Sequence, residues 1–343
     1  MKVIPGNAQA VGERHEQQDA FGFIDKDDTA FVAHGGVLAV VADGMGGMAL
    51  GRQASQRAVD TLLKAYVEKR LDETIPEALT RALHAANADV VKLADEADLE
   101  GNVGTTVVAA VIHQGQLHWV SVGDSHLYLS RQGTLKQLTT DHVYAAELDQ
   151  AVREGNLSQE EAERHPERRS LTSYVGLPGL TAIDTGTGAV EVGDRVLLCS
   201  DGLYGSLSEA EMAAALTGDP QRAAEALIGQ GLAKRYAHQD NLTAVVMAWE
   251  TEERLAQQQQ QESLQATDVP KVHRFSRMGI GIAIFLAWLL GFATGRYWET
   301  AKSLLTHTGQ TGEGAQTLSA QEREKLSPAT QEQHPAKEGA NNE

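Results

Sequence analysis

The sequence predicts an α+β protein built from antiparallel sheets and amphipathic helices. Three observations predict this class: short runs rich in β-branched and aromatic residues, glycine-centred turns beside some of these runs, and longer stretches with apolar residues at four-residue spacing. The two kinds of segment come in blocks and not in strict alternation, which is typical of separate helix and sheet layers. The chain of 343 residues is long enough for one large domain or two small ones.

Short apolar runs mark the expected strands. A turn at Gly115 joins two of the runs, and a similar turn at Gly133 follows another, as in antiparallel hairpins. Because β-branched and aromatic residues fill these runs, they suit a pleated, buried surface. The expected strands are residues 38–42, 106–111, 117–122, 126–130, 195–199 and 243–249.

Three amphipathic stretches are expected to form helices. Residues 52–69 and 76–94 carry apolar side chains about every four residues, which places these side chains on one face of a helix. Asp219 and Pro220 are residue types favoured at the N-cap and the first helical position, so a third helix is expected over 220–234.

A polar segment interrupts this pattern. Residues 142–170 contain little apolar surface to bury, and Ser158 and Glu161 have the spacing of a capping box for a short helix. We therefore expect this segment to lie on the surface beside the core.

The composition changes at the end of the last expected strand and predicts four segments. We expect a globular domain over residues 1–250, a polar glutamine-rich linker over 251–277, a transmembrane helix over 278–295 and a polar, disordered tail over 296–343. The transmembrane helix is expected because its residues carry no charge and reach the lower end of the roughly 17–25 residues that cross a bilayer.

The termini predict an orientation for this span. Because the N-terminus lacks the apolar stretch of a secretory signal, residues 1–250 are expected in the cytoplasm, which makes the chain a single-pass inner-membrane protein with its tail outside. Basic residues in 271–277 agree with that orientation. Ala287, Gly291 and Gly295 lie four residues apart and would let two spans approach as a homodimer.

Charge and cysteine content exclude other classes. The formal net charge of −18 argues against a nucleic-acid-binding protein, which neutralises phosphates with Lys and Arg. The single cysteine, Cys199, cannot form an intrachain disulfide. A phosphatase with a cysteine nucleophile would need an arginine where Gly205 stands, so we interpret Cys199 as a buried structural residue.

Five aspartates share a position at the ends of expected strands. Acids at strand ends can converge on one end of a sheet pair, where they repel one another unless cations lie between them. Hard divalent ions such as Mg²⁺ and Mn²⁺ prefer oxygen ligands of this kind. Gly44 would let the chain turn so that its own carbonyl faces such an ion. The five acids are Asp19, Asp43, Asp124, Asp201 and Asp240.

These motifs resemble a known family. RHEQQD, VADGMGG, GTTVVA, VGDSHLYL, LCSDGLYGSLS and QDNLTAVV occur in the order and approximate spacing of the type-2C, metal-dependent (PPM) serine/threonine protein phosphatases. The similarity covers about residues 7–250, and the segment 142–176 resembles the flap of the bacterial members. The resemblance implies a four-layer α-β-β-α sandwich with a metal centre of two Mn²⁺ or Mg²⁺ ions between two antiparallel sheets.

The resemblance assigns roles at the metal centre. It implies that Asp43 bridges both ions, that Gly44 offers its carbonyl, and that Asp201 and Asp240 complete the shell of the first ion.

Three further positions match residues with roles in the family. Asp19 would hold metal-bound water, acting through that water and not as a direct ligand. Asp124 matches an acid that, with Asp201, holds a third ion in bacterial relatives. Arg14 matches the arginine that binds the substrate phosphate, for which a planar guanidinium is well suited.

The activity implied is the hydrolysis of phosphoserine and phosphothreonine in proteins. Two ions lower the pKa of a bridging water, which attacks phosphorus without a covalent phosphoenzyme. The expected partners are phosphorylated proteins, a serine/threonine kinase whose action the enzyme reverses, and the lipid bilayer.

Five departures from the family pattern concern the surroundings of the metal centre. Gln18 replaces the usual Glu before Asp19, so the second ion is expected to bind mainly through water and more weakly. Gln17 replaces the usual Asn, which changes the side-chain length at an expected hydrogen-bonding site. Met45 stands where eukaryotic members have histidine. His126 replaces an arginine after GDS, and Ser173–Tyr174 replaces Arg-Ala near the flap; both changes concern flap position and substrate choice.

The remaining histidines near these motifs are expected not to be metal ligands, since no paired spacing such as H-x-x-x-H is present. They include His15, His142, His165 and His238.

Two alternatives remain. Asp25 in DKDDT fits the nucleophile loop of haloacid-dehalogenase-like phosphatases, but that chemistry needs a parallel sheet, whereas this run is expected in a hairpin. A catalytically weak module of the same fold that binds phosphoproteins at the membrane is the other. Retention of the acids at 43, 201 and 240 argues against it, because a binding module has no need of a self-repelling cluster.

Overall fold

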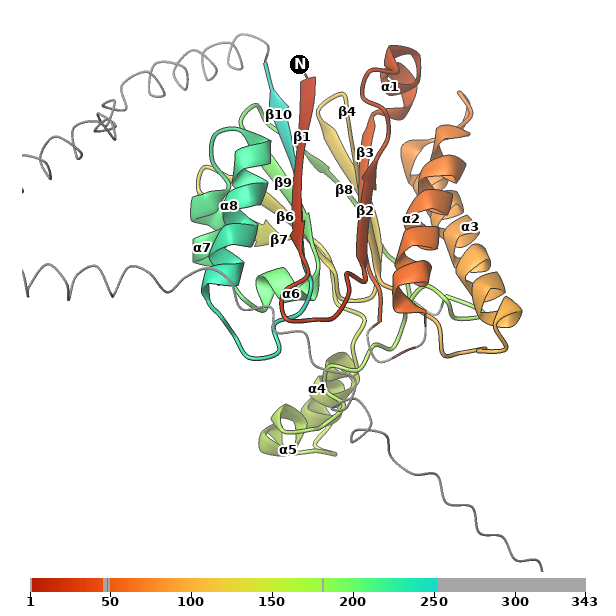
Figure 1. Cartoon of the computed structure of the whole chain (residues 1–343), viewed down its shortest axis with the longest axis vertical. Coiled ribbons are helices and arrows are strands. Elements are labelled where there is room, and N and C mark those ends of the chain that lie inside the picture. The colour runs from red at the N-terminus through yellow and green to blue at the C-terminus, as the bar shows by residue number, and fades with distance from the viewer. Residues whose placement is uncertain (1, 46–47, 49, 181, 252–343) are drawn as a thin grey trace, which may run out of the picture. The chain divides into compact units, whose positions relative to one another are not determined.

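Two five-stranded sheets form the centre of the protein. The computed structural model describes residues 2–45, 48, 50–180 and 182–251 (Figure 1). Every strand pairing within the two sheets is antiparallel. Sheet 1 has the order β1 (Lys2–Ala10), β10 (Leu242–Glu250), β9 (Arg195–Cys199), β6 (His126–Arg131) and β7 (Thr134–Gln137). Sheet 2 has the order β2 (Asp19–Phe23), β3 (Val37–Asp43), β4 (Val107–His113), β5 (Gln116–Val122) and β8 (Asp184–Ala189).

Helices cover the outer face of each sheet, and a short helix, α1 (Thr29–Gly35), connects β2 to β3. Figure 1 shows α2 (Gly51–Val67) and α3 (Ile75–Glu96) beside sheet 2, and α7 (Glu209–Ala215) and α8 (Pro220–Ala233) beside sheet 1. The four layers confirm the expected α-β-β-α sandwich. The expected helices 52–69, 76–94 and 220–234 are α2, α3 and α8, with ends that differ by at most two residues.

Three hydrophobic clusters lie between the four layers. One fills the space between the sheets and includes Val41 and Leu198; the second packs sheet 2 against α2 and α3, and the third packs sheet 1 against its helices. Val40 and Val41 point to different clusters although they are neighbours. Both faces of β3 are therefore buried, which is why its sequence is a continuous apolar run.

Capping residues set several helix ends. Asp219 accepts a hydrogen bond from the Arg222 amide and Pro220 follows it, as the sequence predicts for α8. Ser158 and Glu161 form the predicted capping box of α5 (Gln159–Glu163). Together with α4 (Ala145–Arg153), α5 forms the polar excursion that projects from one end of the sandwich in Figure 1.

All six predicted strands are present, and β7 follows the turn expected at Gly133, but β1, β2 and β8 are not apparent from the apolar pattern. The β8 sequence DTGTGA is polar and rich in glycine. Its Gly186 is explained by the neighbouring strand, since a Cβ there would lie 2.0 Å from the ring of Trp119. Only the packed structure shows this requirement.

The haloacid-dehalogenase interpretation is excluded by the sheets. Asp25 lies in an exposed turn between β2 and α1, where its Oδ1 accepts a hydrogen bond from the Asp27 amide at 2.9 Å. The segment does not form a tight hairpin as expected, because α1 intervenes before β3. No parallel strand pair occurs in the described residues, so the sheet that this chemistry requires is missing from them.

The chain divides into two compact units, of which the first ends at Asp268 and contains all the described residues. The predicted transmembrane helix 278–295, the tail 296–343 and all but the first residue of the linker 251–277 lie outside the described residues. Among the residues that are described, no helix has both the length and the apolar character needed to cross a bilayer.

Candidate metal centre

The five predicted aspartates come from five separate connections that meet at one end of the sandwich. Asp19 begins β2 and Asp43 ends β3, and the antiparallel register places them directly opposite each other. The other three flank strands of sheet 1: Asp201 follows β9 as the first residue of α6 (Asp201–Tyr204), Asp240 precedes β10, and Asp124 lies in the turn before β6. Figure 1 shows these strand ends on the side from which α4 and α5 project.

Asp43 is the centre of this cluster. Burial raises the pKa of Asp43 well above its ordinary value, and repulsion from Asp19, Asp201, Asp124 and Asp240, in that order, raises it further. All four other acids therefore lie close enough to affect one carboxyl group, as the sequence predicts. A cluster of this kind needs either protons or cations.

Asp19 is held by two hydroxyl groups from sheet 1. Its Oδ2 accepts hydrogen bonds from Ser200 Oγ at 2.7 Å and Thr243 Oγ1 at 2.6 Å. Burial nevertheless raises the pKa of Asp19 to about 6, because it outweighs these two hydrogen bonds. The two hydroxyls fix the orientation of a carboxyl group that belongs to the other sheet.

Two buried carboxylate oxygens of the cluster lack a hydrogen-bond donor. They are Oδ1 of Asp19 and Oδ1 of Asp201. A buried charged oxygen without a donor is costly, and a divalent cation would compensate that cost. The donor set consists of hard carboxylate oxygens, so it fits Mg²⁺ or Mn²⁺.

The described side chains do not form a closed metal cage. Among them, no three carboxylate, imidazole or thiol groups are placed so as to hold one ion by themselves. Mg²⁺ and ions of similar preference keep several waters and need only one or two carboxylates from the protein. The site therefore fits a hydrated ion and does not fit structural zinc, which takes four protein ligands.

Gly44 is required by close packing. A Cβ on Gly44 would lie 2.3 Å from the carbonyl oxygen of Gly51, at the start of α2, and 2.7 Å from that of Gln18. Gly44 is not among the residues with positive φ, so the sharp turn proposed from the sequence is not the reason for this glycine. The neighbouring Gly46 and Gly47 lie outside the described residues.

Arg14 lies at the solvent-exposed edge of the cluster. Its guanidinium Nη2 donates to Asp240 Oδ2 at 2.6 Å, and 47% of the Arg14 side chain is exposed. The structure thus brings Arg14 next to a predicted metal ligand, where an incoming phosphate could reach it. The connection that carries Arg14 is held by Asn241, which donates to the carbonyls of Val11 and Glu16.

Three further parts of the site are not predicted by any sequence pattern: Ser200, Asn241 and Thr243. Ser200 directly precedes Asp201 in the motif LCSDG. In QDNLT, Asn241 directly follows Asp240, and Thr243 lies three residues after it. Their hydrogen-bond partners are far away in sequence, so only the assembled sheets show which acid or loop each one supports.

The predicted flap begins beside Asp124. His142 and Gly123 exchange hydrogen bonds, from the His142 amide to the Gly123 carbonyl at 3.0 Å and from the Gly123 amide to His142 Nδ1 at 3.1 Å. The Thr172 amide donates to the His142 carbonyl at 2.9 Å, which closes the base of the excursion. His142 therefore has a structural role at the turn that carries Asp124.

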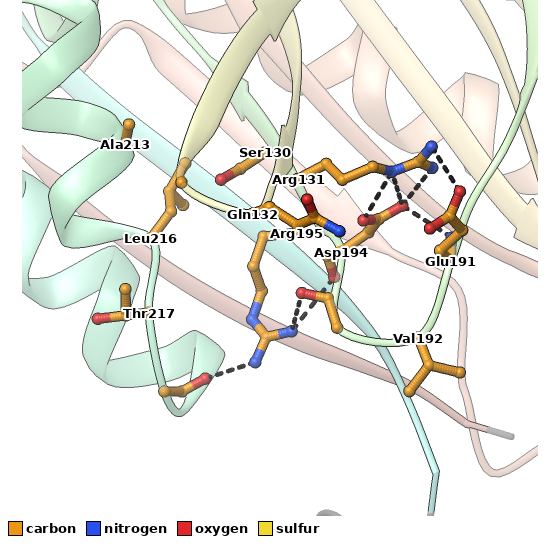
Figure 2. A pocket seen from close by; sticks show the side chains of 13 residues that line it. Ser130, Arg131, Gln132, Glu191, Val192, Asp194, Arg195, Ala213, Leu216 and Thr217 are labelled. Atoms are coloured by element: carbon orange, nitrogen blue, oxygen red, sulfur yellow. Dashed lines mark hydrogen bonds and ion pairs between the residues drawn. The ribbon is translucent and has the colours of Figure 1, made fainter.

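A separate cavity of about 280 Å³ lies at the opposite ends of β6 and β9 (Figure 2). Its two arginines are already paired: Arg131 with Asp194 and Glu191, and Arg195 with Glu250. Because these carboxylates neutralise both guanidinium groups, the cavity is poorly suited to bind a phosphate. None of the six predicted site side chains lines it.

Comparison with known proteins identifies the family. Residues 11–266 match the sequence profile of a family described as protein phosphatase 2C. The chain belongs to the protein phosphatase 2C family. This membership confirms the expectation of a serine/threonine phosphatase of the PPM type.

Protein phosphatase 2C relatives occur in several bacteria. The chain is 36% identical over 239 residues to the serine/threonine phosphatase stp of Listeria monocytogenes, covering 68% of this chain and 90% of that protein. It is also 36% identical over 245 residues to the serine/threonine protein phosphatase PstP of Mycobacterium tuberculosis, covering 68% of this chain and 44% of that protein.

Solved structures show the same protein phosphatase 2C fold. A serine/threonine phosphatase of S. agalactiae superposes with a TM-score of 0.62 at 28% identity, over 72% of this chain and all of that chain. The catalytic domain of PstP, in complex with 2 manganese ions, superposes with a TM-score of 0.58 at 29% identity, over 73% of this chain and 99% of that chain. The ions in that relative agree with the expected Mn²⁺ or Mg²⁺ cofactor.

Proposed function

We propose that this protein hydrolyses phosphoserine and phosphothreonine in proteins, with divalent Mn²⁺ or Mg²⁺ as cofactor. The observation that carries the proposal is the convergence of four acids on half-buried Asp43, with buried carboxylate oxygens of Asp19 and Asp201 left without hydrogen-bond donors. Membership of the protein phosphatase 2C family supports the same chemistry.

The residues that would hold the ions are those the sequence predicts. Asp43, Asp201, Asp240 and the Gly44 carbonyl would hold two ions, and Asp124 with Asp201 a third. When bound, such ions neutralise phosphoryl oxygens and lower the pKa of water so that it can act as a nucleophile near neutral pH.

The chain itself supplies orientation and charge. Asp19 has Oδ2 fixed by two hydroxyls, so Oδ1 is the oxygen left to orient an attacking water or to accept its proton. Arg14, at the exposed edge, presents planar N–H donors to the phosphate oxygens and so positions phosphorus over the cluster.

The test uses the purified full chain, stripped of metal with EDTA and then supplied with Mn²⁺. We expect the wild type to release phosphate from p-nitrophenyl phosphate and from a phosphothreonine peptide, and Asp43→Asn to abolish this activity. Asp25→Asn is the matched control, because Asp25 is an exposed turn residue away from the cluster, and it should retain activity. Full activity of Asp43→Asn would contradict the metal mechanism, and an inactive wild type would favour the phosphoprotein-binding module.

We further propose that the enzyme is anchored to the inner membrane by residues 278–295 and that it reverses the action of a serine/threonine kinase. The uncharged 278–295 segment with basic residues before it supports the anchor. Carbonate extraction of membranes should leave the full chain in the pellet and release a chain that lacks the segment. Phosphoproteomics of a deletion strain and of an Asp43→Asn strain, each against the wild type, would identify substrates as the sites whose phosphorylation rises in both, and therefore the kinase that modifies these sites.

A further inference from the structure

A buried aromatic cluster lies directly behind the turn that carries Asp124. His126 is 5% exposed and its ring stacks on Tyr204 of α6, with ring centroids 3.7 Å apart and planes 7° from parallel. His126 Nδ1 lies 2.7 Å from the Tyr128 hydroxyl and Nε2 lies 2.9 Å from Asp141 Oδ1. Both ring nitrogens and one ring face of His126 are thus engaged.

The partners of His126 fix its orientation. Asp141 Oδ1 also accepts from Gln137 Nε2 at 3.2 Å, so it acts as an acceptor toward both groups. Burial raises the pKa of Tyr128 well above its ordinary value, so its hydroxyl keeps its proton and can donate to Nδ1. These contacts favour the tautomer with the proton on Nε2.

Tyr204 connects this cluster to two of the acids. It is the third residue after Asp201 in α6, and its hydroxyl donates to the backbone carbonyl of Asp124 at 3.0 Å. Burial, followed by repulsion from Asp124 and Asp201, raises the pKa of Tyr204 well above its ordinary value, so the hydroxyl remains a donor. One side chain therefore links the turn after β5 to the turn after β9.

The polar character of the cluster needs an explanation beyond packing. An apolar residue would fill the position of His126 without the cost of burying two ring nitrogens that each need a partner. A residue that only filled space would not fix the rotation of the neighbouring tyrosine. Stacking together with two hydrogen bonds fixes ring orientation, and the Tyr204 hydroxyl transmits that orientation to the Asp124 backbone.

We propose that His126 and Tyr204 are positioning residues that hold the Asp124 turn at a fixed distance from Asp201, so that the two carboxylates can share a divalent cation. The proposal rests on the proposed function, because it assumes that the acid cluster binds divalent ions. Neither His126 nor Tyr204 is proposed to contact the substrate.

Tyr204→Phe is the decisive variant because it keeps the stacked ring and removes only the hydroxyl. The control is Tyr66→Phe, which removes a buried hydroxyl that donates to the Gly35 carbonyl at 2.6 Å, a contact unrelated to the acids. Titration calorimetry of the metal-free full chain with Mn²⁺ should show one ion, the same one whose binding Asp124→Asn weakens, bound about fivefold less tightly in Tyr204→Phe, the fold-change expected for one lost hydrogen bond. The other ions and the Tyr66→Phe isotherm should be unchanged.

A second variant and a second measurement keep the test independent of one substitution. His126→Phe retains a ring but loses both polar contacts, and it should weaken the binding of the same ion. The double variant should weaken that binding by no more than the stronger single variant does, because both substitutions act through one contact. In the metal-free chain, hydrogen exchange of the backbone amides of residues 123–126 should accelerate in Tyr204→Phe and not in Tyr66→Phe.

The outcomes separate this proposal from the proposed function. If the wild type binds Mn²⁺ and hydrolyses phosphopeptide but Tyr204→Phe matches Tyr66→Phe in the isotherm or in exchange, the positioning role is wrong and the function stands. Equally weakened binding of every ion in Tyr204→Phe would also overturn the positioning role. A wild type that binds no Mn²⁺ overturns both.

Discussion

Replacing Asp124 by asparagine is expected to stabilise the metal-free protein at neutral and alkaline pH. Burial, followed by repulsion from Asp201 and Asp141, raises the pKa of Asp124 from 3.8 to about 7. Between these two values the folded state keeps a proton that the unfolded state has released. The free energy of unfolding therefore falls as pH rises through this interval, and the loss is complete above the folded-state pKa.

The magnitude follows from the interval between the two pKa values. At about 1.4 kcal/mol for each pKa unit, ionisation of Asp124 costs about 4 kcal/mol at pH 8. Relaxation of the turn and entry of water reduce this cost. We therefore expect the free energy of unfolding of Asp124→Asn to exceed that of the wild type by about 2–4 kcal/mol at pH 8. At a pH of about 4 the advantage should be below about 1 kcal/mol, because the wild-type carboxyl is then protonated in the folded state.

Urea denaturation of the full chain in EDTA, followed from about pH 4 to 8, measures this difference. Mn²⁺ should reduce or reverse it, because the wild type gains more binding free energy from the ion than the variant does. Asp60→Asn, at an exposed position of α2, is the control and should change stability by less than about 0.5 kcal/mol. A difference between Asp124→Asn and the wild type that does not vary with pH would refute the electrostatic reasoning.

Two further substitutions test packing and substrate binding. Gly44→Ala should lower the free energy of unfolding by about 1–3 kcal/mol in urea, because its Cβ would lie 2.3 Å from the Gly51 carbonyl oxygen, whereas Gly179→Ala meets nothing within 4 Å. Equal stability of these two variants would show that the backbone at the start of α2 can shift at little energetic cost and would contradict the packing argument. Arg14→Ala should raise KM for a phosphothreonine peptide about tenfold while stability changes by less than about 1 kcal/mol, since its ion pair with Asp240 is partly solvent-exposed. Steady-state kinetics measure the effect, and an unchanged KM would argue against a role for Arg14 in phosphate binding.

The parts of the fold that the sequence predicts are those with a local pattern. The continuous apolar run at 38–42 marks β3 because both of its faces are buried. The cap and proline at 219–220 mark the start of α8 for an equally local reason. In contrast, β8 is stabilised by its pairing with β5, where Gly186 leaves space for the ring of Trp119, and nothing within β8 itself indicates this.

The same distinction holds for the metal centre. Each acid is recognisable because it lies in a short motif at or beside the end of a strand, and the structure brings the other four together around Asp43. The groups that orient them are not recognisable in this way. Thr243 is paired with Asp19 across 224 positions of sequence, and Tyr204 with Asp124 across 80. Such pairs depend on how the two sheets stack, which no local pattern encodes.

The pairing of β1 with β10 determines where the last described strand ends relative to the acids. Ala10 pairs with Leu242 at the end of sheet 1 that carries the acids, and Lys2 pairs with Glu250 at the other end. Eight steps of about 3.3 Å separate Leu242 from Glu250, so the last strand finishes about 26 Å from the acids. Glu250, which ends the last described strand, therefore lies at the end of sheet 1 opposite the acids, beside the start of β1.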